Sequence, residues 1–192
     1  FLSKEQILTA YHNISEQRSL RESIPDWLDA LGQTELGDKW AATIHALNEL
    51  PHLVLRVNRL KTDAATLLKD LAKHQIYGRV IQDDAVLIEQ RGKMFSTPAF
   101  RNGWFELQDF SSQQVAPFLE AQPGMRVIDA CAGNGGKTLH LAALMQNKGR
   151  IIALDTDAKK LEQLRLRARR AGVSIIETRQ IESSKTIKRL AQ

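Results

Sequence analysis

A glycine-rich loop at residues 129–138, with the sequence Asp-Ala-Cys-Ala-Gly-Asn-Gly-Gly-Lys-Thr, constrains the fold more than any other feature of this chain. It follows an apolar run at residues 126–130, which predicts a buried strand, and precedes helical spacing over residues 138–146. Glycines let a ligand approach the backbone because no side chain intervenes. The helix that follows presents unpaired N–H groups and a partial positive charge. The loop therefore predicts a site for a nucleotide-like ligand.

Three kinds of ligand can be compared with the loop residue by residue. A phosphate-binding P-loop requires a glycine where Cys131 stands, so that interpretation fails. A dinucleotide fingerprint beginning at Gly133 requires a glycine where Thr138 stands, which weakens it. The remaining candidate, S-adenosylmethionine (SAM), needs an acceptor for its ribose hydroxyls at the end of the next strand. Asp155 stands there, 19 residues after Gly136. The alternative is a tight turn followed by a helix cap, but it does not explain why strand, loop, helix and acid occur in this order.

Strand and helix patterns alternate from residue 111 onward. A helix capped by Ser111 or Ser112 leads through a Pro-Gly turn to the strand before the loop. After the loop helix, the pattern predicts a second strand at residues 150–155, a helix at 158–171 closed by Gly172, and a third strand at 173–176. This alternation predicts a parallel, doubly wound sheet. We therefore expect an α/β protein in which residues 111–192 form the first half of a Rossmann-type domain.

Residues 1–50 carry helical patterns. Pro25 and Asp26 mark a helix start, because proline is well tolerated in the first turn. A further helix is predicted with Thr34 as its N-cap and four apolar residues along one face, namely Leu36, Trp40, Ile44 and Leu47. Packing is the expected role of this helical region.

Residues 51–110 predict a small α+β module. A β-rich run at residues 53–57 is followed by helical spacing over 62–74 and by two short strands at 79–81 and 85–88, which turn at Asp83 and Asp84. This β-α-β-β order is typical of ferredoxin-like sheets that bind RNA. No strand is rich in aromatic residues, so RNA binding does not follow from the sequence of the module. Residues 93–110 are interpreted as an irregular, aromatic connection.

Composition excludes several classes of protein. The chain is 43% hydrophobic and 26% charged, which is ordinary for a globular protein. No apolar run approaches the length of a membrane span, so no membrane partner is expected. The single cysteine, Cys131, excludes an intrachain disulfide and fits a cytoplasmic protein. One cysteine and five scattered histidines offer no zinc-ligand spacing, so no metal site is expected.

Charge is distributed unevenly along the chain. Residues 148–192 hold 12 basic and 5 acidic residues, whereas residues 1–147 hold 15 basic and 17 acidic ones. A basic end favours a polyanionic partner such as RNA, and a solvated basic helix face is the alternative. The candidates for phosphate contacts lie on the predicted helix 158–171: Lys159, Lys160, Arg165, Arg167, Arg169 and Arg170.

Three elements of the sequence, in this order, resemble the Sun/Nop-type RNA cytosine-5 methyltransferases. Residues 55–61 read Leu-Arg-Val-Asn-Arg-Leu-Lys, like the family's L-R-V-N-x-L-K. Residues 103–113 resemble its G-x-F-x-x-Q-D-x-S-S-Q, and residues 129–138 its D-x-C-A-A-P-G-G-K-T. The resemblance covers roughly residues 50–180, and three ordered elements make it far more specific than a lone glycine loop. It departs from the family at Gly133 and Asn134, where Ala-Pro is usual.

The resemblance implies a set of SAM-binding residues. Asp155 would hold the ribose hydroxyls, and Glu182 is the nearest match to the family's acidic contact near the adenine, although it is one methylene longer than the usual aspartate. Loss of the usual proline frees the loop and is expected to loosen its contacts. The loop residues that would contact SAM are Cys131, Ala132, Gly133, Asn134, Gly135, Gly136 and Lys137.

The catalytic cysteines of the resembled family have no counterpart in these residues. Family members attack cytosine C6 with a cysteine thiolate in a Pro-Cys motif, and a second cysteine in a Thr-Cys motif assists release. Cys131 matches the family's loop cysteine, so no catalytic residue is assigned and the nucleophile is expected beyond Gln192. In the family's strand order residues 126–130 are central, so we expect them to expose an edge and apolar surface that favour association. We expect this chain to be an inactive fragment with weak or absent SAM binding.

These patterns and the resemblance leave one leading function and two alternatives. The leading function is transfer of a methyl group from SAM to C5 of a cytosine in RNA, ribosomal or transfer RNA, by the full-length protein. The first alternative is a non-catalytic RNA-binding or assembly module that retains a degenerate methyltransferase half. The second is a nicotinamide-dependent oxidoreductase, which Thr138 disfavours.

Overall fold

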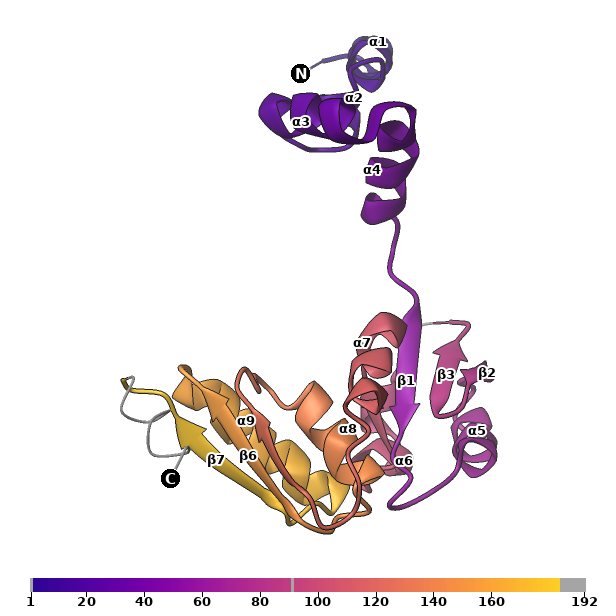
Figure 1. The fold of residues 1–192 in the computed structure, drawn as a ribbon. Coiled ribbons are helices and arrows are strands. Elements are labelled where there is room, and N and C mark those ends of the chain that lie inside the picture. The colour runs from indigo at the N-terminus through magenta and orange to yellow at the C-terminus, as the bar shows by residue number, and fades with distance from the viewer. Residues whose placement is uncertain (1, 91, 184–192) are drawn as a thin grey trace. The chain divides into compact units, whose positions relative to one another are not determined.

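A computed structural model describes residues 2–90 and 92–183 of the 192-residue chain. The chain packs as two compact units, Phe1–Pro51 and His52–Gln192. The first unit is helical and the second contains two sheets (Figure 1). Among the described residues, none of the helices is long and apolar enough to cross a membrane.

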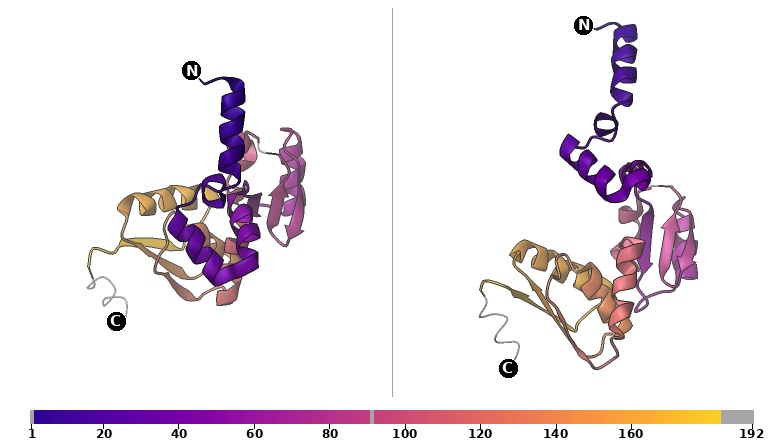
Figure 2. Two further views of the ribbon diagram at one scale, coloured as in Figure 1. Left: turned by 90° about the horizontal axis from the view of Figure 1, so that it is seen from above. Right: turned by 45° about the horizontal axis from the view of Figure 1, so that its top comes forward.

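The first unit consists of short helices. Ser3 and Gln6 form a reciprocal capping box at its start, in which the Ser3 side chain accepts from the Gln6 backbone and the Gln6 side chain accepts from the Ser3 backbone. The first helix is exposed along its described side chains and lies apart from the third and fourth (Figure 2). The elements are α1 (Lys4–Ser15), α2 (Arg18–Arg21), α3 (Asp26–Leu36), η1 (Gly37–Lys39) and α4 (Trp40–Asn48).

The predicted helix with Thr34 as its N-cap is wrong. Thr34 lies inside α3, where its hydroxyl donates to the Ala30 carbonyl at 2.9 Å. Gly37 adopts a left-handed φ of 53° and ends α3, and α4 begins three residues later. Trp40 and Ile44 are buried as expected, whereas Leu36, which the turn at Gly37 separates from them, and Leu47 are exposed.

The second unit begins with a ferredoxin-like module. Its order is β1 (Leu53–Val57), α5 (Ala64–Ala72), β2 (Gly78–Gln82), β3 (Ala85–Ile88), η2 (Met94–Ser96), α6 (Pro98–Arg101) and β4 (Phe105–Leu107). The strands pair antiparallel in the order β2-β3-β1-β4. The predicted β-α-β-β order is confirmed. The connection predicted to be irregular contains a further helix and strand, which completes the β-α-β-β-α-β pattern.

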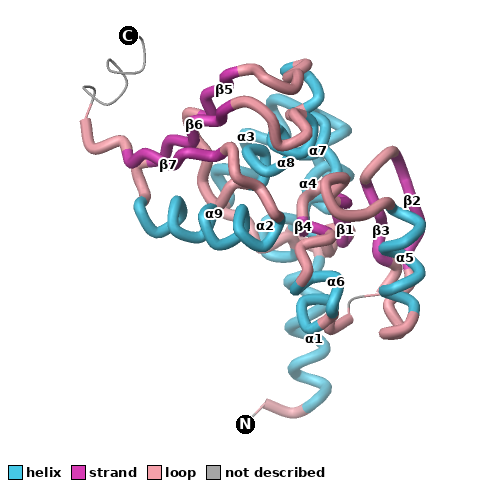
Figure 3. Tube along the Cα trace, turned by 90° about the horizontal axis from the view of Figure 1, so that it is seen from below, coloured by secondary structure: helices cyan, strands magenta, loops and turns pink. Residues whose placement is uncertain are grey.

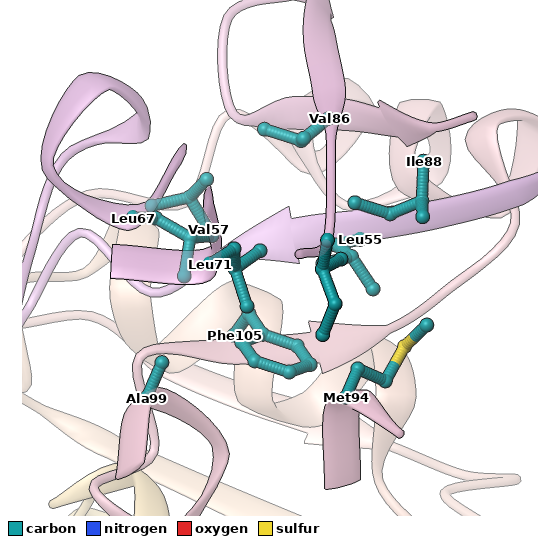
Figure 4. Packing of buried hydrophobic residues seen from close by; sticks show 10 residues of the cluster. Leu55, Val57, Leu67, Leu71, Val86, Ile88, Met94, Ala99 and Phe105 are labelled. Atoms are coloured by element: carbon teal, nitrogen blue, oxygen red, sulfur yellow. The ribbon is translucent and has the colours of Figure 1, made fainter. Parts of the chain in front are cut away.

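Side chains of this sheet alternate between a hydrophobic core and the opposite face. Leu55, Val57 and Phe105 point into a core closed by Leu67 and Leu71 of α5 (Figure 4). Because successive residues of a strand face opposite sides of the sheet, Arg56 of β1 and Glu106 of β4 point away from this core. These two charged residues are partners in the β1–β4 register, and each is only 3% exposed.

The second sheet is parallel, in the order β5-β6-β7 (Figure 3). On one of its faces Ala153 of β6 packs with Leu139 of α8 and Leu164 of α9. The remaining elements are α7 (Phe110–Val115), η3 (Pro117–Leu119), β5 (Arg126–Asp129), α8 (Gly136–Leu144), β6 (Arg150–Asp155), α9 (Ala158–Ala171) and β7 (Ile176–Gln180). This architecture confirms the predicted first half of a Rossmann-type sheet.

Three predicted elements in this half have wrong boundaries. The helix predicted over residues 138–146 runs over Gly136–Leu144. The N-cap of α7 is Asp109, which accepts from the Ser112 backbone at 3.1 Å, and neither serine caps the helix. The third strand begins at Ile176, whereas it was predicted to begin at residue 173. The Val173 N–H closes the end of α9 on the Ala168 carbonyl, and Ser174 bonds Asn147, so the chain cannot yet join the sheet.

Strand β5 is less buried than its apolar sequence predicts. Within the described residues it pairs with β6 alone, and Ile128 is 51% exposed. Over the part of the chain that the structure describes, β5 thus presents the open edge that we expected from the strand order of the resembled family.

Candidate functional site

The glycine loop connects the end of β5 to the start of α8, and its glycines serve different purposes. Gly133 and Gly135 both have left-handed φ values, of 52° and 85°. A Cβ on Gly135 would lie 2.0 Å from Leu164 Cδ1, so this glycine is required for packing between α8 and α9. A Cβ on Gly133 would meet nothing within 4 Å. Gly133 therefore keeps the backbone open on a side where a ligand has room.

Asp129 fixes both ends of the loop. Its Oδ2 accepts a hydrogen bond from the Thr138 hydroxyl at 2.7 Å, and its Oδ1 accepts from the Cys131 backbone N–H at 3.3 Å. Thr138 is fully buried. The residue that weakens a dinucleotide interpretation thus has a structural role, because it joins the first turn of α8 to the last residue of β5.

Asp155 lies against the loop, although 22 residues separate it from Gly133 in sequence. Its Oδ2 accepts from the Gly133 backbone N–H at 2.8 Å, and its Oδ1 accepts from the Asp157 N–H at 2.9 Å. Hydrogen bonds from the Asp157 and Gly133 backbones hold the pKa of the Asp155 carboxyl below its usual value. The structure therefore presents an ionised carboxylate beside the open part of the glycine loop.

The other residues predicted to contact SAM differ in their exposure and in their position relative to the loop. Cys131, Asn134 and Lys137 are exposed on the loop, whereas Ala132 and Gly135 are buried and Gly136 is half-buried. Glu182 is exposed two residues beyond β7, and within the described residues no hydrogen bond or ion pair joins it to the loop. A hollow of about 400 Å³ lies beside the loop, lined by Asn134, Lys159, Lys160, Glu162 and Gln163.

Residues of the upstream 55–61 element hold the C-terminal end of α9, a role that sequence reasoning missed. Buried Asn58 donates its side-chain amide to the Gly103 carbonyl at 2.8 Å and to the Ala171 carbonyl at 2.9 Å. Lys61 Nζ donates to the Arg170 carbonyl at 2.8 Å. A cation and an amide at a helix C-terminus satisfy carbonyls that have no partner within the helix. These bonds join the ferredoxin-like module to the Rossmann half.

A charge cluster at the same junction includes two residues predicted to contact RNA. Glu106 of β4 accepts from Arg167 at 2.8 Å and from Arg170 at 2.5 Å. The Arg170 guanidinium also lies 3.9 Å from the centre of the Phe100 ring. Arg167 and Arg170 are thus engaged within the protein. The sequence signal for this cluster was a single charged residue inside each of two otherwise apolar runs, Arg56 in β1 and Glu106 in β4.

His140 of α8 is a buried titratable residue at the same junction. It is 6% exposed, and it lines a cleft of about 170 Å³ with Arg59, Asp84 and Gln113. Burial, with the positive charges of Arg56 and Arg59, lowers the pKa of His140 to about 3. The imidazole is therefore neutral at physiological pH.

The residues around the loop fit a ligand that contains a ribose. Gly133 leaves space at the backbone, and the ionised Asp155 carboxylate suits ribose hydroxyl donors. The exposed loop and the adjoining hollow leave room for the rest of such a ligand.

Comparison with known families agrees with this arrangement. A model of the 16S rRNA methyltransferase RsmB/F family matches residues 116–192, and a model of the ferredoxin-like domain of the same methyltransferases matches residues 24–94. The chain is 36% identical over 165 residues to a probable ribosomal RNA small subunit methyltransferase B of Bacillus subtilis, covering 84% of this chain and 36% of the relative. It is 32% identical over 156 residues to a ribosomal RNA small subunit methyltransferase B of Pseudomonas syringae, covering 80% and 35%.

Solved structures show the same fold. A methyltransferase homolog from Pyrococcus horikoshii superposes with a TM-score of 0.80 at 29% identity, covering 91% of this chain and 58% of that one. NSun6 from the same organism, solved with SFG, superposes with a TM-score of 0.77 at 19% identity, covering 85% and 67%, and supports the fold alone. The chain spans about a third of the length of the curated relatives named above. By both family models, these relatives and the shared fold, the chain belongs to the RsmB/F family of rRNA methyltransferases, whose methyl donor is SAM.

Proposed function

We propose that the protein to which these residues belong transfers a methyl group from SAM to C5 of a cytosine in RNA, with ribosomal RNA as the favoured substrate. The observation that carries the proposal is the bond between the Asp155 carboxylate and the Gly133 N–H, beside open space at the loop. Relatives named as ribosomal RNA small subunit methyltransferases support the class of substrate.

In this proposal the described residues bind the methyl donor and position the two modules. The backbone of residues 131–137 would hold SAM, Asp155 its ribose hydroxyls and Glu182 its adenine. When bound, SAM supplies an electrophilic methyl group on a sulfonium ion. Cys131 is the single cysteine of these residues and lies in the donor loop, so we do not assign it as a nucleophile.

The test uses the gene product that contains these residues, ribosomal RNA and SAM with a labelled methyl group. We expect label in 5-methylcytidine after digestion of the RNA to nucleosides, and an Asp155→Ala variant is expected to lose it. Label in any other nucleoside would refute the cytosine-C5 assignment. Label that survives in Asp155→Ala at the wild-type rate would refute the donor site.

A parallel reaction with the 192-residue chain alone tests the role of Cys131. We expect weak SAM binding and no methyl transfer, because covalent attack on cytosine C6 needs a cysteine other than the loop residue. A Cys131→Ser variant of the gene product is expected to retain most of its activity. Methyl transfer by the 192-residue chain, abolished by Cys131→Ser, would contradict this assignment.

A further inference from the structure

The junction between the ferredoxin-like module and the Rossmann half surrounds one buried carboxylate with three arginines. Glu106 and Arg56 are partners across the β1–β4 pair, and both are 3% exposed. Arg167 donates to Glu106 Oε2 through Nε at 3.1 Å and Nη2 at 2.8 Å, and Arg170 donates to Oε1 at 2.5 Å. Glu106 is thus the shared counter-ion of a cluster with excess positive charge.

Two of these arginines also hold carbonyls of the glycine loop. Arg167 uses its remaining nitrogen, Nη1, to donate to the Asn134 carbonyl at 2.7 Å. Arg56 Nη1 donates to the Gly136 carbonyl at 3.3 Å. Arg170, by contrast, contacts Glu106 and the Phe100 ring and makes no hydrogen bond to the loop within the described residues. The donor loop is therefore held from outside by side chains whose charge Glu106 balances.

Without such hydrogen bonds the glycine loop would be free to adopt several conformations. Asn134 is exposed and lies between Gly133 and Gly135, both of which have left-handed φ values. Glycine loses more conformational freedom on ordering than any other residue, so this segment is costly to hold in one shape. Hydrogen bonds from charged donors are stronger than neutral ones.

We infer that Glu106 is a positioning residue for the methyl donor, because it orients Arg167 onto the Asn134 carbonyl and so fixes the shape of the glycine loop. The inference rests on the proposed SAM site and adds a link between that site and the ferredoxin-like module. Removal of the Glu106 charge would leave the buried Arg56 and the half-buried Arg167 and Arg170 without this counter-ion, which is unfavourable. Burial already lowers the pKa of Arg56 to about 10, and the Glu106 charge opposes that shift. Arg167 would then turn toward water and release the loop.

The test measures hydrogen exchange of the Gly133 and Gly135 amides without ligand. These amides are bonded to Asp155 Oδ2 and the Ala132 carbonyl, so their exchange reports the closed loop. In Glu106→Gln and in Arg167→Met we expect them to exchange about tenfold faster, while amides in the centre of β6 keep their protection. If Glu106→Gln does not fold, Arg167→Met alone decides the question.

Arg170→Met is the matched control, because it removes a partner of the same carboxylate that does not touch the loop. A role limited to docking the two modules predicts equal effects of Arg167→Met and Arg170→Met, and that result would overturn the inference. Unchanged loop exchange in Arg167→Met would also overturn it.

Calorimetry with SAM gives the second readout, with an expected loss of affinity of about tenfold in Arg167→Met and little loss in Arg170→Met. Failure of the wild-type gene product that contains these residues to bind SAM would count against the proposed donor site, whereas the exchange data would still decide the role of Glu106.

Discussion

Replacement of His140 tests the burial of a neutral imidazole at the junction of the two modules. The pKa of His140 is about 3 in the folded chain, against 6.5 for an ordinary histidine, and burial is the main cause. As the pH falls, the unfolded chain therefore takes up a proton well before the folded chain does. The free energy of unfolding should be unaffected above about pH 6.5 and should fall steadily from there to about pH 3.

The magnitude follows from the gap between the two pKa values. Each pH unit within that window costs about 1.4 kcal/mol, so His140 should remove about 2 kcal/mol of stability between pH ~7.5 and pH ~5. Other groups also titrate in this range, so the comparison must be between variants.

Urea denaturation at the two pH values measures this difference. Fluorescence of Trp104 reports the second unit when Trp27 and Trp40 of the first unit are replaced by phenylalanine in every variant. His140→Gln should lose about 2 kcal/mol less than wild type on acidification, and His74→Gln, at an exposed position of the same unit, should behave like wild type. Equal losses of stability in wild type and His140→Gln would refute the conclusion that the His140 imidazole stays neutral in the folded chain.

Two further substitutions test the loop and the junction. Gly135→Ala should cost about 1–3 kcal/mol and Gly133→Ala about 1 kcal/mol in urea denaturation, because only the former adds a clash with Leu164 to the left-handed φ; equal costs would contradict the packing role of Gly135. Asn58→Ala should cost about 1–3 kcal/mol and speed amide exchange at the C-terminal end of α9, because two buried carbonyls lose their donor; a stability within error of wild type would show that these bonds contribute nothing net.

Local signals in the sequence were sufficient for part of the fold. Residues 150–155 and 158–171 were predicted with the bounds that the structure has, because an aspartate caps the helix and Gly172 ends it in a left-handed conformation. Strand β4 was missed, since three residues are too few to show a period of two and its pairing with β1 is a long-range contact. The start of β7 was misplaced because the Asn147 bonds to Ser174 depend on tertiary structure.

The candidate site likewise contains residues that the sequence identified and residues that only the tertiary structure reveals. The glycine loop and Asp155 were found from sequence, since strand, loop, helix and acid follow one another at short range. The role of Glu106 could not be predicted, because it depends on the register of β1 with β4 and on the packing of α9 against that sheet. The sequence signal for Arg167 suggested RNA contact, and only its bonds to Glu106 and Asn134 reveal a structural role.

The most direct test of the central claim is an NMR titration of the 192-residue chain, isotopically labelled, with SAM. This measurement detects weak binding and identifies the residues involved. The account predicts progressive shifts centred on the amides of residues 131–137 and 155–157, which are lost in Asp155→Ala. Shifts caused by NAD at these amides, with none caused by SAM, would contradict it, as would a SAM response that is unchanged by Asp155→Ala.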